Sequence, residues 1–264
     1  MTADGAEPGP VVSEGHDASP PRRAVDTIRV VSWNIQFGVE IEAATAALAE
    51  HPDLRDADII LLQEMDEIGT SRLATSLSLN WVYAAPGPHK QSGRNFGNAV
   101  LSPWCTSAPD VVELPHKAAV NGQARMLVHA TVMVGGMPIE AGSVHTEVPS
   151  LSNPKRLRQF EQIGLAAASW PSERLVIGGD FNTITRRGIK AVAERMAVIG
   201  AVRVTDGVGP TLRRGKDFSL DHVFARGMRC VDAGTVHGLD ASDHRPVWVM
   251  LQNDLSAERT TPDA

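Results

Sequence analysis

Residues 175–182 read LVIGGDFN, an apolar run that ends in two glycines, an aspartate and an asparagine. An apolar run of this length, bounded by turn-forming residues, predicts a strand that is buried on both faces. Polar residues at the end of such a strand enter the loops where α/β proteins assemble their sites. The segment therefore predicts a central strand and two candidate site residues, Asp180 and Asn182.

The same combination of apolar strand and polar residue occurs in five other segments. They are VVSWNI at 30–35, DIILLQE at 58–64, SVH at 143–145, LDHV at 220–223 and SDHRP at 242–246. A single polar residue at a strand end is explained by capping of the next turn. Six such ends on one chain carry hard oxygen ligands, a water-orienting carboxylate and histidines. This set indicates metal-assisted phosphoester hydrolysis.

Hydrophobic periodicity predicts the remaining elements. Strands are predicted at 28–35, 58–63, 98–102, 125–134, 137–145, 174–180, 220–225 and 246–251, and helices near 40–50, 70–78, 154–169 and 188–199. Gly135 and Gly136 predict a hairpin between the fourth and fifth of these strands. Asn153 is expected to cap the third helix, with Pro154 in its first position. Hairpins mixed with helices predict an α/β domain with mixed sheets, and the chain has no glycine-rich phosphate loop.

The two ends of the chain differ in composition from the middle. Residues 1–26 contain four prolines and three glycines, with almost no large apolar side chains. Such a segment cannot bury enough surface to offset its ordering entropy, so we expect a disordered tail. Residues 253–264 are expected to form a C-terminal tail. One domain is therefore predicted over residues 27–252.

The composition is that of a soluble globular protein, with 42% hydrophobic and 21% charged residues in a chain of 264. The net charge of −6 argues against nonspecific coating of nucleic acid, although a bound metal ion can reverse the field locally. Cys105 and Cys230 are predicted to be buried free thiols. No apolar run approaches the ~18–20 residues that span a bilayer, and no signal peptide is evident. We expect a cytoplasmic protein without a transmembrane segment or an obligate protein partner.

Taken in their order and spacing, the motifs resemble those of the endonuclease/exonuclease/phosphatase superfamily, which includes pancreatic deoxyribonuclease, abasic-site endonucleases, neutral sphingomyelinases and inositol polyphosphate 5-phosphatases. The motifs are SWNI at 32–35, QE at 63–64, GDFN at 179–182, LD at 220–221 and SDH at 242–244, and the match covers essentially all of 28–250. GNAVLS at 97–102 also resembles the family's central strand. The resemblance implies a deoxyribonuclease I-like fold, a four-layer α/β sandwich of two mixed β-sheets flanked by helices.

The resemblance also implies a metal site. Glu64 would be the principal ligand of Mg²⁺ or Mn²⁺, with Asn34 beside it and Asp243 reaching the same or a second ion. Carboxylate and amide oxygens suit these ions, and the chain has no thiolate or clustered histidine set that favours zinc.

Five residues receive catalytic roles from the same resemblance. Asp180 would orient and deprotonate the attacking water, and Asn182 would hold that water or the phosphate. His244, oriented by Asp221, would donate to a non-bridging oxygen or to the leaving group as charge builds. His145 stands where the deoxyribonuclease branch has a histidine and would bind another phosphate oxygen.

Further residues bear on the substrate. Arg94, Asn95 and Asn98 are predicted as secondary substrate contacts, with a solvated loop as the alternative for the first two. The pair Gln36-Phe37 and the absence of a tyrosine at an evident site position argue against an abasic-site endonuclease in particular. The segment LDHVF at 220–224 lacks the arginine-bearing signature of inositol 5-phosphatases.

Two functions remain open at this point. The first is a nuclease-like phosphodiesterase, endonuclease or exonuclease, with nucleic acid as its partner; Arg186-Arg187 and the basic segment 213–216 adjoin the motifs and support it. The second is a phosphatase or phosphodiesterase for a small-molecule or lipid-linked phosphate, supported by the acidic net charge and the 5% aromatic content. A non-enzymatic binding module would predict loss of Glu64, Asp180 or His244, and all three are present.

Overall fold

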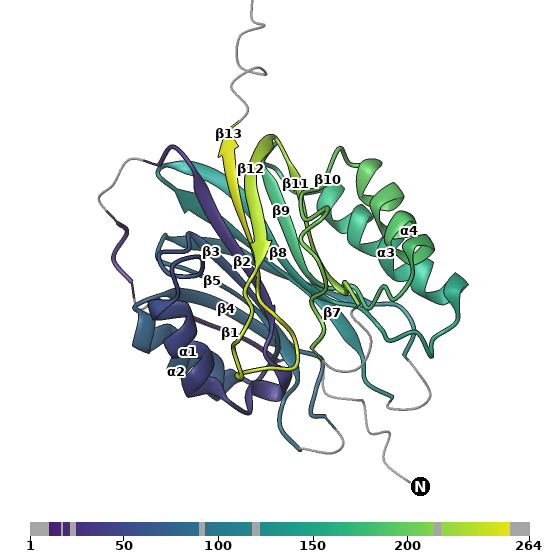
Figure 1. Ribbon diagram of the computed structural model, residues 1–264, viewed down its shortest axis with the longest axis horizontal. Coiled ribbons are helices and arrows are strands. Elements are labelled where there is room, and N and C mark those ends of the chain that lie inside the picture. The colour runs from purple at the N-terminus through teal and green to yellow at the C-terminus, as the bar shows by residue number, and fades with distance from the viewer. Residues whose placement is uncertain are drawn as a thin grey trace, which may run out of the picture.

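The computed structural model describes residues 11–16, 18–21, 25–89, 93–117, 122–213 and 218–253. Within these ranges two β-sheets pack face to face, and a pair of helices covers the outer face of each sheet (Figure 1). The arrangement is the four-layer α/β sandwich that the sequence predicts, so the fold class is confirmed.

The first sheet has seven strands in the order β1-β4-β5-β3-β2-β13-β12. Their bounds are Val11–His16 (β1), Asn80–Ala85 (β4), Gly97–Ser102 (β5), Ile59–Met65 (β3), Ile28–Asn34 (β2), Val247–Asn253 (β13) and Met228–Thr235 (β12). β2 and β3 run parallel, whereas the other neighbouring pairs are antiparallel. The sheet is therefore mixed, as expected.

The second sheet has six strands in the order β10-β11-β9-β8-β7-β6. Their bounds are Val202–Arg203 (β10), Asp221–Arg226 (β11), Leu175–Asp180 (β9), Met137–His145 (β8), Arg125–Val134 (β7) and Thr106–Leu114 (β6). β8 and β9 are parallel, and β7 pairs antiparallel with β8 up to Val134 and Met137. Gly135 and Gly136 between them have positive φ angles of 58° and 87°. This confirms the predicted hairpin, because two-residue turns of this kind require such angles.

Four α-helices are found in the described part of the chain. They are α1 (Ile41–Glu50), α2 (Glu67–Leu77), α3 (Asn153–Ala168) and α4 (Arg186–Ala197). α3 begins at Asn153, and Ser152 holds the cap position, so the predicted cap is wrong by one residue; Pro154 lies in the first turn as expected. None of these helices combines the length and apolarity that a bilayer crossing requires.

Three apolar clusters hold the four layers together. Val30 and Ile59 pack between the two sheets, whereas their neighbours Val31 and Ile60 pack beneath α1 and α2. A third cluster joins α3 and α4 to the outer face of the second sheet. Because successive side chains of a strand point to opposite faces and both faces are covered, the central strands read as continuous apolar runs.

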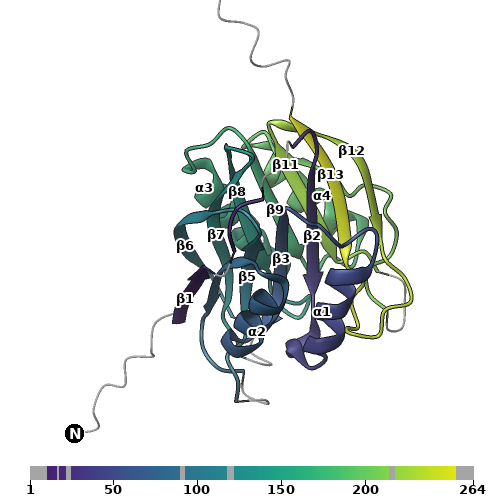
Figure 2. The same cartoon turned by 90° about the vertical axis from the view of Figure 1, so that its left-hand side faces the viewer.

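Two predicted domain boundaries are wrong. Val11–His16, inside the expected tail of residues 1–26, form β1 at the edge of the first sheet (Figure 2). Gly15 lies so close to the indole of Trp81 on β4 that a Cβ atom would stand 2.3 Å from its Nε1. At the other end, Asn253 pairs with Met228 and belongs to β13. Residues 1–10 and 254–264 lie outside the described ranges. Strands β4, β6, β10 and β12 are also absent from the sequence-based prediction. Both cysteines are free thiols, but Cys105 is exposed and Cys230 half-buried, so the predicted burial is wrong.

Strand register brings distant parts of the sequence to one edge of the sandwich. Asn34 closes β2 beside the end of the parallel strand β3, and His145 pairs with Asp180 at the ends of β8 and β9. Asp221, the first residue of β11, also pairs with Asp180. Gly178 lets the sheets approach below this edge, because a Cβ atom there would stand 2.8 Å from a methyl carbon of Leu61.

Candidate active site

Asn34 links the two sheets at this edge. Its Nδ2 donates to Glu64 Oε1 at 3.1 Å and to Asp180 Oδ2 at 3.2 Å. Asn34 and Asp180 are buried, with exposed fractions of 1% and 2%. One amide therefore holds a carboxylate from each sheet within a few ångströms of the other.

Glu64 sits in an irregular stretch of β3. Its φ of 60° and the shift in strand register between Gln63 and Met65 mark a β-bulge, a feature that redirects a side chain next to a site. The backbone N–H of Phe37 donates to Glu64 Oε2 at 3.2 Å. Burial raises the pKa of the Glu64 carboxyl, and the charge of Asp243 raises it further, against lowering by Asn34 and Arg125. Glu64 is thus a carboxylate held where its negative charge is poorly solvated.

Asp180 lies at the centre of the group. The backbone N–H of Asn182, a residue with a φ of 50°, donates to Asp180 Oδ1 at 2.8 Å, while Oδ2 faces the other site residues. Burial raises the Asp180 pKa to about 7; His244 opposes this rise, and the charges of Asp221 and Glu64 add to it. The side chain of Asn182 donates to the Thr146 carbonyl at 3.0 Å.

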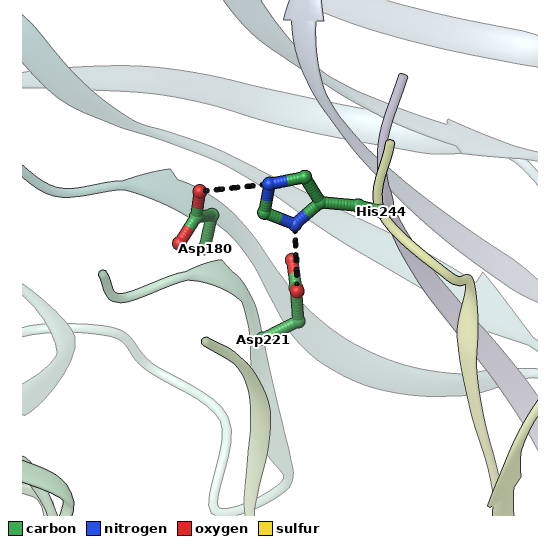
Figure 3. A group of neighbouring side chains, drawn as sticks. All are labelled: Asp180, Asp221 and His244. Atoms are coloured by element: carbon green, nitrogen blue, oxygen red, sulfur yellow. Dashed lines mark hydrogen bonds and ion pairs between the residues drawn. The ribbon is translucent and has the colours of Figure 1, made fainter. Parts of the chain in front are cut away.

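His244 and Asp221 form a buried pair (Figure 3). His244 Nδ1 donates to Asp221 Oδ2 at 2.8 Å, and its Nε2 points toward Asp180 Oδ2 at 3.8 Å. Burial by itself would lower the His244 pKa, but the charge and hydrogen bond of Asp221, with a contribution from Asp180, raise it to about 10. The imidazole is therefore protonated at neutral pH. Ser242 Oγ accepts from the His244 backbone N–H at 3.0 Å and donates to the Asn34 carbonyl at 2.6 Å, which fixes the loop.

His145 approaches the same Asp180 oxygen from the other side, with its Nε2 at 3.5 Å. Its neighbour is Arg125, whose Nη1 lies 3.1 and 3.2 Å from the two ring nitrogens and whose Nη2 pairs with Glu147 Oε1 at 3.3 Å. Burial lowers the His145 pKa well below its usual value, and Arg125 lowers it further. His145 is therefore neutral.

Arg125 contacts the candidate site residue His145 and is absent from the sequence-based prediction. It opens β7 as a lone charge before an apolar run, which is the mirror image of the polar strand ends that identify the other residues. A rule that included polar residues at strand starts would have found it.

The other predicted residues occupy different positions. Asp243 is half-buried beside the site, and its backbone N–H donates to Gln36 Oε1 at 3.1 Å. Arg94 is exposed and forms an ion pair with Asp66, and Asn95 is half-buried on the same loop. Asn98 is buried and donates to the Met126 carbonyl at 2.8 Å, so its amide joins the two sheets and we leave it out of the proposed site.

The predicted basic segments can be placed in part. Arg186 and Arg187 are exposed in the first turn of α4. In the segment 213–216, Arg213 forms an ion pair with Asp240, and residues 214–216 lie outside the described ranges.

The donor set fits a hard divalent cation. Among the described residues, Asp180, Asp221 and His244 offer ligand atoms within 4.8 Å of one another, but an ion there would compete with the His244–Asp221 hydrogen bond. The carboxylates of Glu64 and Asp180 instead converge on the Asn34 amide. Burial raises the pKa of both carboxyls, and the charge of Glu64 raises that of Asp180 further. A bound cation would offset this repulsion and favour both charged forms, so the side of the site around Asn34 and Glu64 suits Mg²⁺ or Mn²⁺ better.

Comparison with known proteins identifies the family. Residues 31–244 match the Endonuclease/Exonuclease/phosphatase family, and the chain belongs to this family. Its members are generally phosphoester hydrolases and typically use divalent metals. The UPF0294 protein VV2535 of Vibrio vulnificus (strain YJ016) is 35% identical over 74 residues, which make up 28% of this chain and 26% of that protein. The chain thus matches about a quarter of the length of this relative.

Solved structures share the fold. The endonuclease/exonuclease/phosphatase from Beutenbergia cavernae DSM 12333 has a TM-score of 0.69 at 22% identity, covering 87% of this chain and 72% of that chain. TDP2 of D. rerio, complexed with a single-strand DNA product, has a TM-score of 0.70 at 14% identity, covering 87% and 100%. The mannosyl-6-phosphatase Bt3783 of Bacteroides thetaiotaomicron has a TM-score of 0.65 at 14% identity, covering 85% and 99%. At these identities the likeness shows the fold alone.

Proposed function

We propose that the protein is a divalent-metal-dependent phosphodiesterase of the nuclease kind, which hydrolyses phosphodiester bonds with a water molecule activated in the site. One observation carries the proposal. Two buried histidines, one protonated and one neutral, approach the same oxygen of Asp180 at 3.8 and 3.5 Å. This arrangement supplies a base, an acid and a phosphate-binding group around one point.

Asn34, Glu64 and Asp243 would hold Mg²⁺ or Mn²⁺. The bound ion would stabilise negative charge on the phosphoryl oxygens. Asn34 and Glu64 also hold Asp180 in place through the shared amide. Asp243 contributes negative charge from the opposite loop, as its effect on the Glu64 pKa indicates.

Asp180 would orient and deprotonate the attacking water. With a pKa near 7, a substantial part of the Asp180 population is ionised at neutral pH and can accept a proton. The Asn182 backbone N–H occupies Oδ1, which leaves Oδ2 directed toward the substrate side. The Asn182 amide has one hydrogen bonded to Thr146 and would use the other to hold the water or the phosphate.

His244 would donate a proton or a hydrogen bond from Nε2, because Asp221 occupies Nδ1 and keeps the ring charged. The acceptor would be the leaving oxygen or a non-bridging oxygen on which charge builds. His145 and Arg125 would bind another phosphate oxygen. A neutral imidazole beside a fixed guanidinium attracts an anion without adding a second titrating acid.

A phosphatase or phosphodiesterase for a small-molecule or lipid-linked phosphate is the competing function. The net charge of −6 favours it, because a long polyanion is repelled by an acidic surface. The two functions share the same catalytic groups and differ in what surrounds the phosphate.

A substrate panel tests the proposal. Single-stranded oligonucleotide, bis-p-nitrophenyl phosphate, p-nitrophenyl phosphate, and inositol and lipid phosphates would be offered with Mg²⁺ or Mn²⁺ and with chelator. We expect diester hydrolysis that requires the metal and stops with chelator. Glu64→Gln should raise the metal concentration needed for half-maximal rate, whereas Glu113→Gln, an exposed change on β6, should not. Full activity in protein stripped of metal would reject the proposal, and exclusive turnover of monoesters would favour the competing function.

A further inference from the structure

Three aromatic rings form a continuous group beside the candidate site. Phe37 and His89 meet edge to face with centroids 4.8 Å apart, and Phe96 lies 5.2 Å from Phe37 and 5.3 Å from His89. We call these three residues the aromatic wall. They come from two separate segments, the turn after β2 and the loop before β5, so the wall exists only in the folded chain.

The inner end of the wall is fixed by the site itself. Phe96 is buried, with 6% of its surface exposed, and its ring lies 5.7 Å from that of His145. The guanidinium carbon of Arg125 lies over the Phe96 ring at 5.2 Å from its centroid. Phe96 thus contacts the two residues that we assign to phosphate binding, and the wall continues outward from the phosphate position.

The outer end of the wall is partly exposed, and the backbone of Phe37 there adopts an unfavourable conformation. Phe37 and His89 are half-buried rather than enclosed in the core. Phe37 has a φ of 60°, in the left-handed region that non-glycine residues adopt only when their surroundings hold them there. Its backbone N–H donates to Glu64 Oε2, so the same strained turn positions both the candidate metal ligand and the ring.

The rings have the chemistry of a stacking surface. Burial and the nearby Arg125 lower the His89 pKa, so its imidazole is neutral and presents an uncharged face at neutral pH. A planar heterocycle gains dispersion and electrostatic attraction against such rings, and every nucleobase has a π-face that can use it. An acyl chain has no planar face, and a paired base has both faces covered by its neighbours.

We propose that the aromatic wall stacks an unpaired nucleobase next to the scissile phosphate, and that the substrate class is therefore single-stranded nucleic acid or a nucleotide phosphodiester. This inference rests on the proposed phosphodiesterase function and specifies its substrate. Phe37 is the specificity-determining residue because its ring is the partly exposed one held by the strained turn. The phosphate of the stacked nucleotide would lie toward His145 and Arg125.

The test compares binding and turnover on two matched substrates. One is a short single-stranded oligonucleotide with 2-aminopurine beside the central phosphodiester, and the other has an abasic tetrahydrofuran in the same place. Binding is followed with the full chain carrying His244→Ala, in the presence of Mg²⁺, by fluorescence quenching and anisotropy. Turnover is followed with wild-type protein. Phe37→Leu removes the ring at similar volume, Phe37→Trp keeps an aromatic ring, and Val39→Ala is a matched exposed change on the same turn.

We expect quenching of 2-aminopurine and tighter binding of the base-bearing oligonucleotide. Phe37→Leu should weaken that binding about 5- to 100-fold and bring the ratio between the two substrates close to one, the scale of one lost stacking contact. Phe37→Trp should preserve the ratio, and Val39→Ala should leave it as in the wild type. Equal affinity of the wild type for both substrates, or equal loss on both with Phe37→Leu, would overturn the inference. Quenching that depends on Phe37 without any turnover would reject the phosphodiesterase function and leave the stacking site standing.

Discussion

The two histidines of the site differ in charge although their burial is alike. His145 and His244 are 3% and 7% exposed, and burial acts to lower the pKa of each. His145 lies beside the Arg125 guanidinium and stays neutral. His244 donates to the Asp221 carboxylate, which raises its pKa to about 10. The nearest charged partner, and not the depth of burial, decides which histidine can act as an acid.

The difference divides the site into two sides that share Asp180. The His244–Asp221 side comes from β11 and the loop before β13, and in the proposed mechanism it would supply a proton. The His145–Arg125 side comes from β7 and β8, and in the proposed mechanism it would bind a phosphate oxygen through the guanidinium and the neutral imidazole. Four experiments test this division.

The largest effect is expected for loss of the protonated histidine. His244→Ala should reduce kcat by about 10²- to 10⁴-fold, the usual contribution of a positioned acid or base. Steady-state kinetics on a phosphodiester would measure it. His237→Ala, an exposed histidine outside the site, is the matched control and should leave kcat unchanged. An unchanged kcat in His244→Ala would remove the assignment of an acid to this side.

Loss of the partner carboxylate should cost less. Asp221→Asn should reduce kcat by roughly 10- to 100-fold, because the imidazole remains but is poorly oriented and less often charged. The double variant with His244→Ala should resemble His244→Ala alone, since the two side chains act as one unit. A double-variant loss equal to the product of the two single losses would show that Asp221 acts independently of His244.

The same pair should make stability depend on pH. Because the His244 pKa is raised from 6.5 to about 10 in the folded protein, its stabilisation is fully present below pH 6.5 and is lost as pH rises through about 10. In metal-free protein we expect the wild type to lose on the order of 2 kcal/mol more unfolding free energy across this window than His244→Gln does. Urea unfolding at a series of pH values would measure the difference. Parallel curves for the two proteins would contradict a charged His244.

The smallest effect is expected on the neutral side. Arg125→Met combined with Glu147→Gln removes the guanidinium without leaving a buried carboxylate unpaired. The His145 pKa should rise, and KM should increase about 10-fold, the scale of one charge-assisted hydrogen bond to phosphate. NMR titration and kinetics would follow the two quantities, with Glu147→Gln alone as the control. A His145 pKa that does not move would show that burial alone keeps the ring neutral.

The central strands and the polar residues at their ends can be predicted from the amino-acid sequence. A run such as LVIGGDFN can be recognised as a strand because its hydrophobic period, its length and its flanking turn residues involve only a few neighbouring positions. The hairpin at Gly135-Gly136 can be predicted for the same reason. The edge strands cannot be recognised in this way. Strand β1, for example, has little apolar pattern and is held in the sheet by pairing with β4. Its place in the sheet depends on a partner more than sixty residues away.

The charges and the surroundings of the site residues depend on contacts that form when the chain folds. Nothing local to His145 or His244 shows that one stands beside Arg125 and the other beside Asp221, because both contacts join residues about twenty positions apart. The aromatic wall likewise joins Phe37 to rings from another loop, in a chain with 5% aromatic residues. Electrostatic and stacking interactions act through space, so they become defined only when the strands have set the distances between side chains.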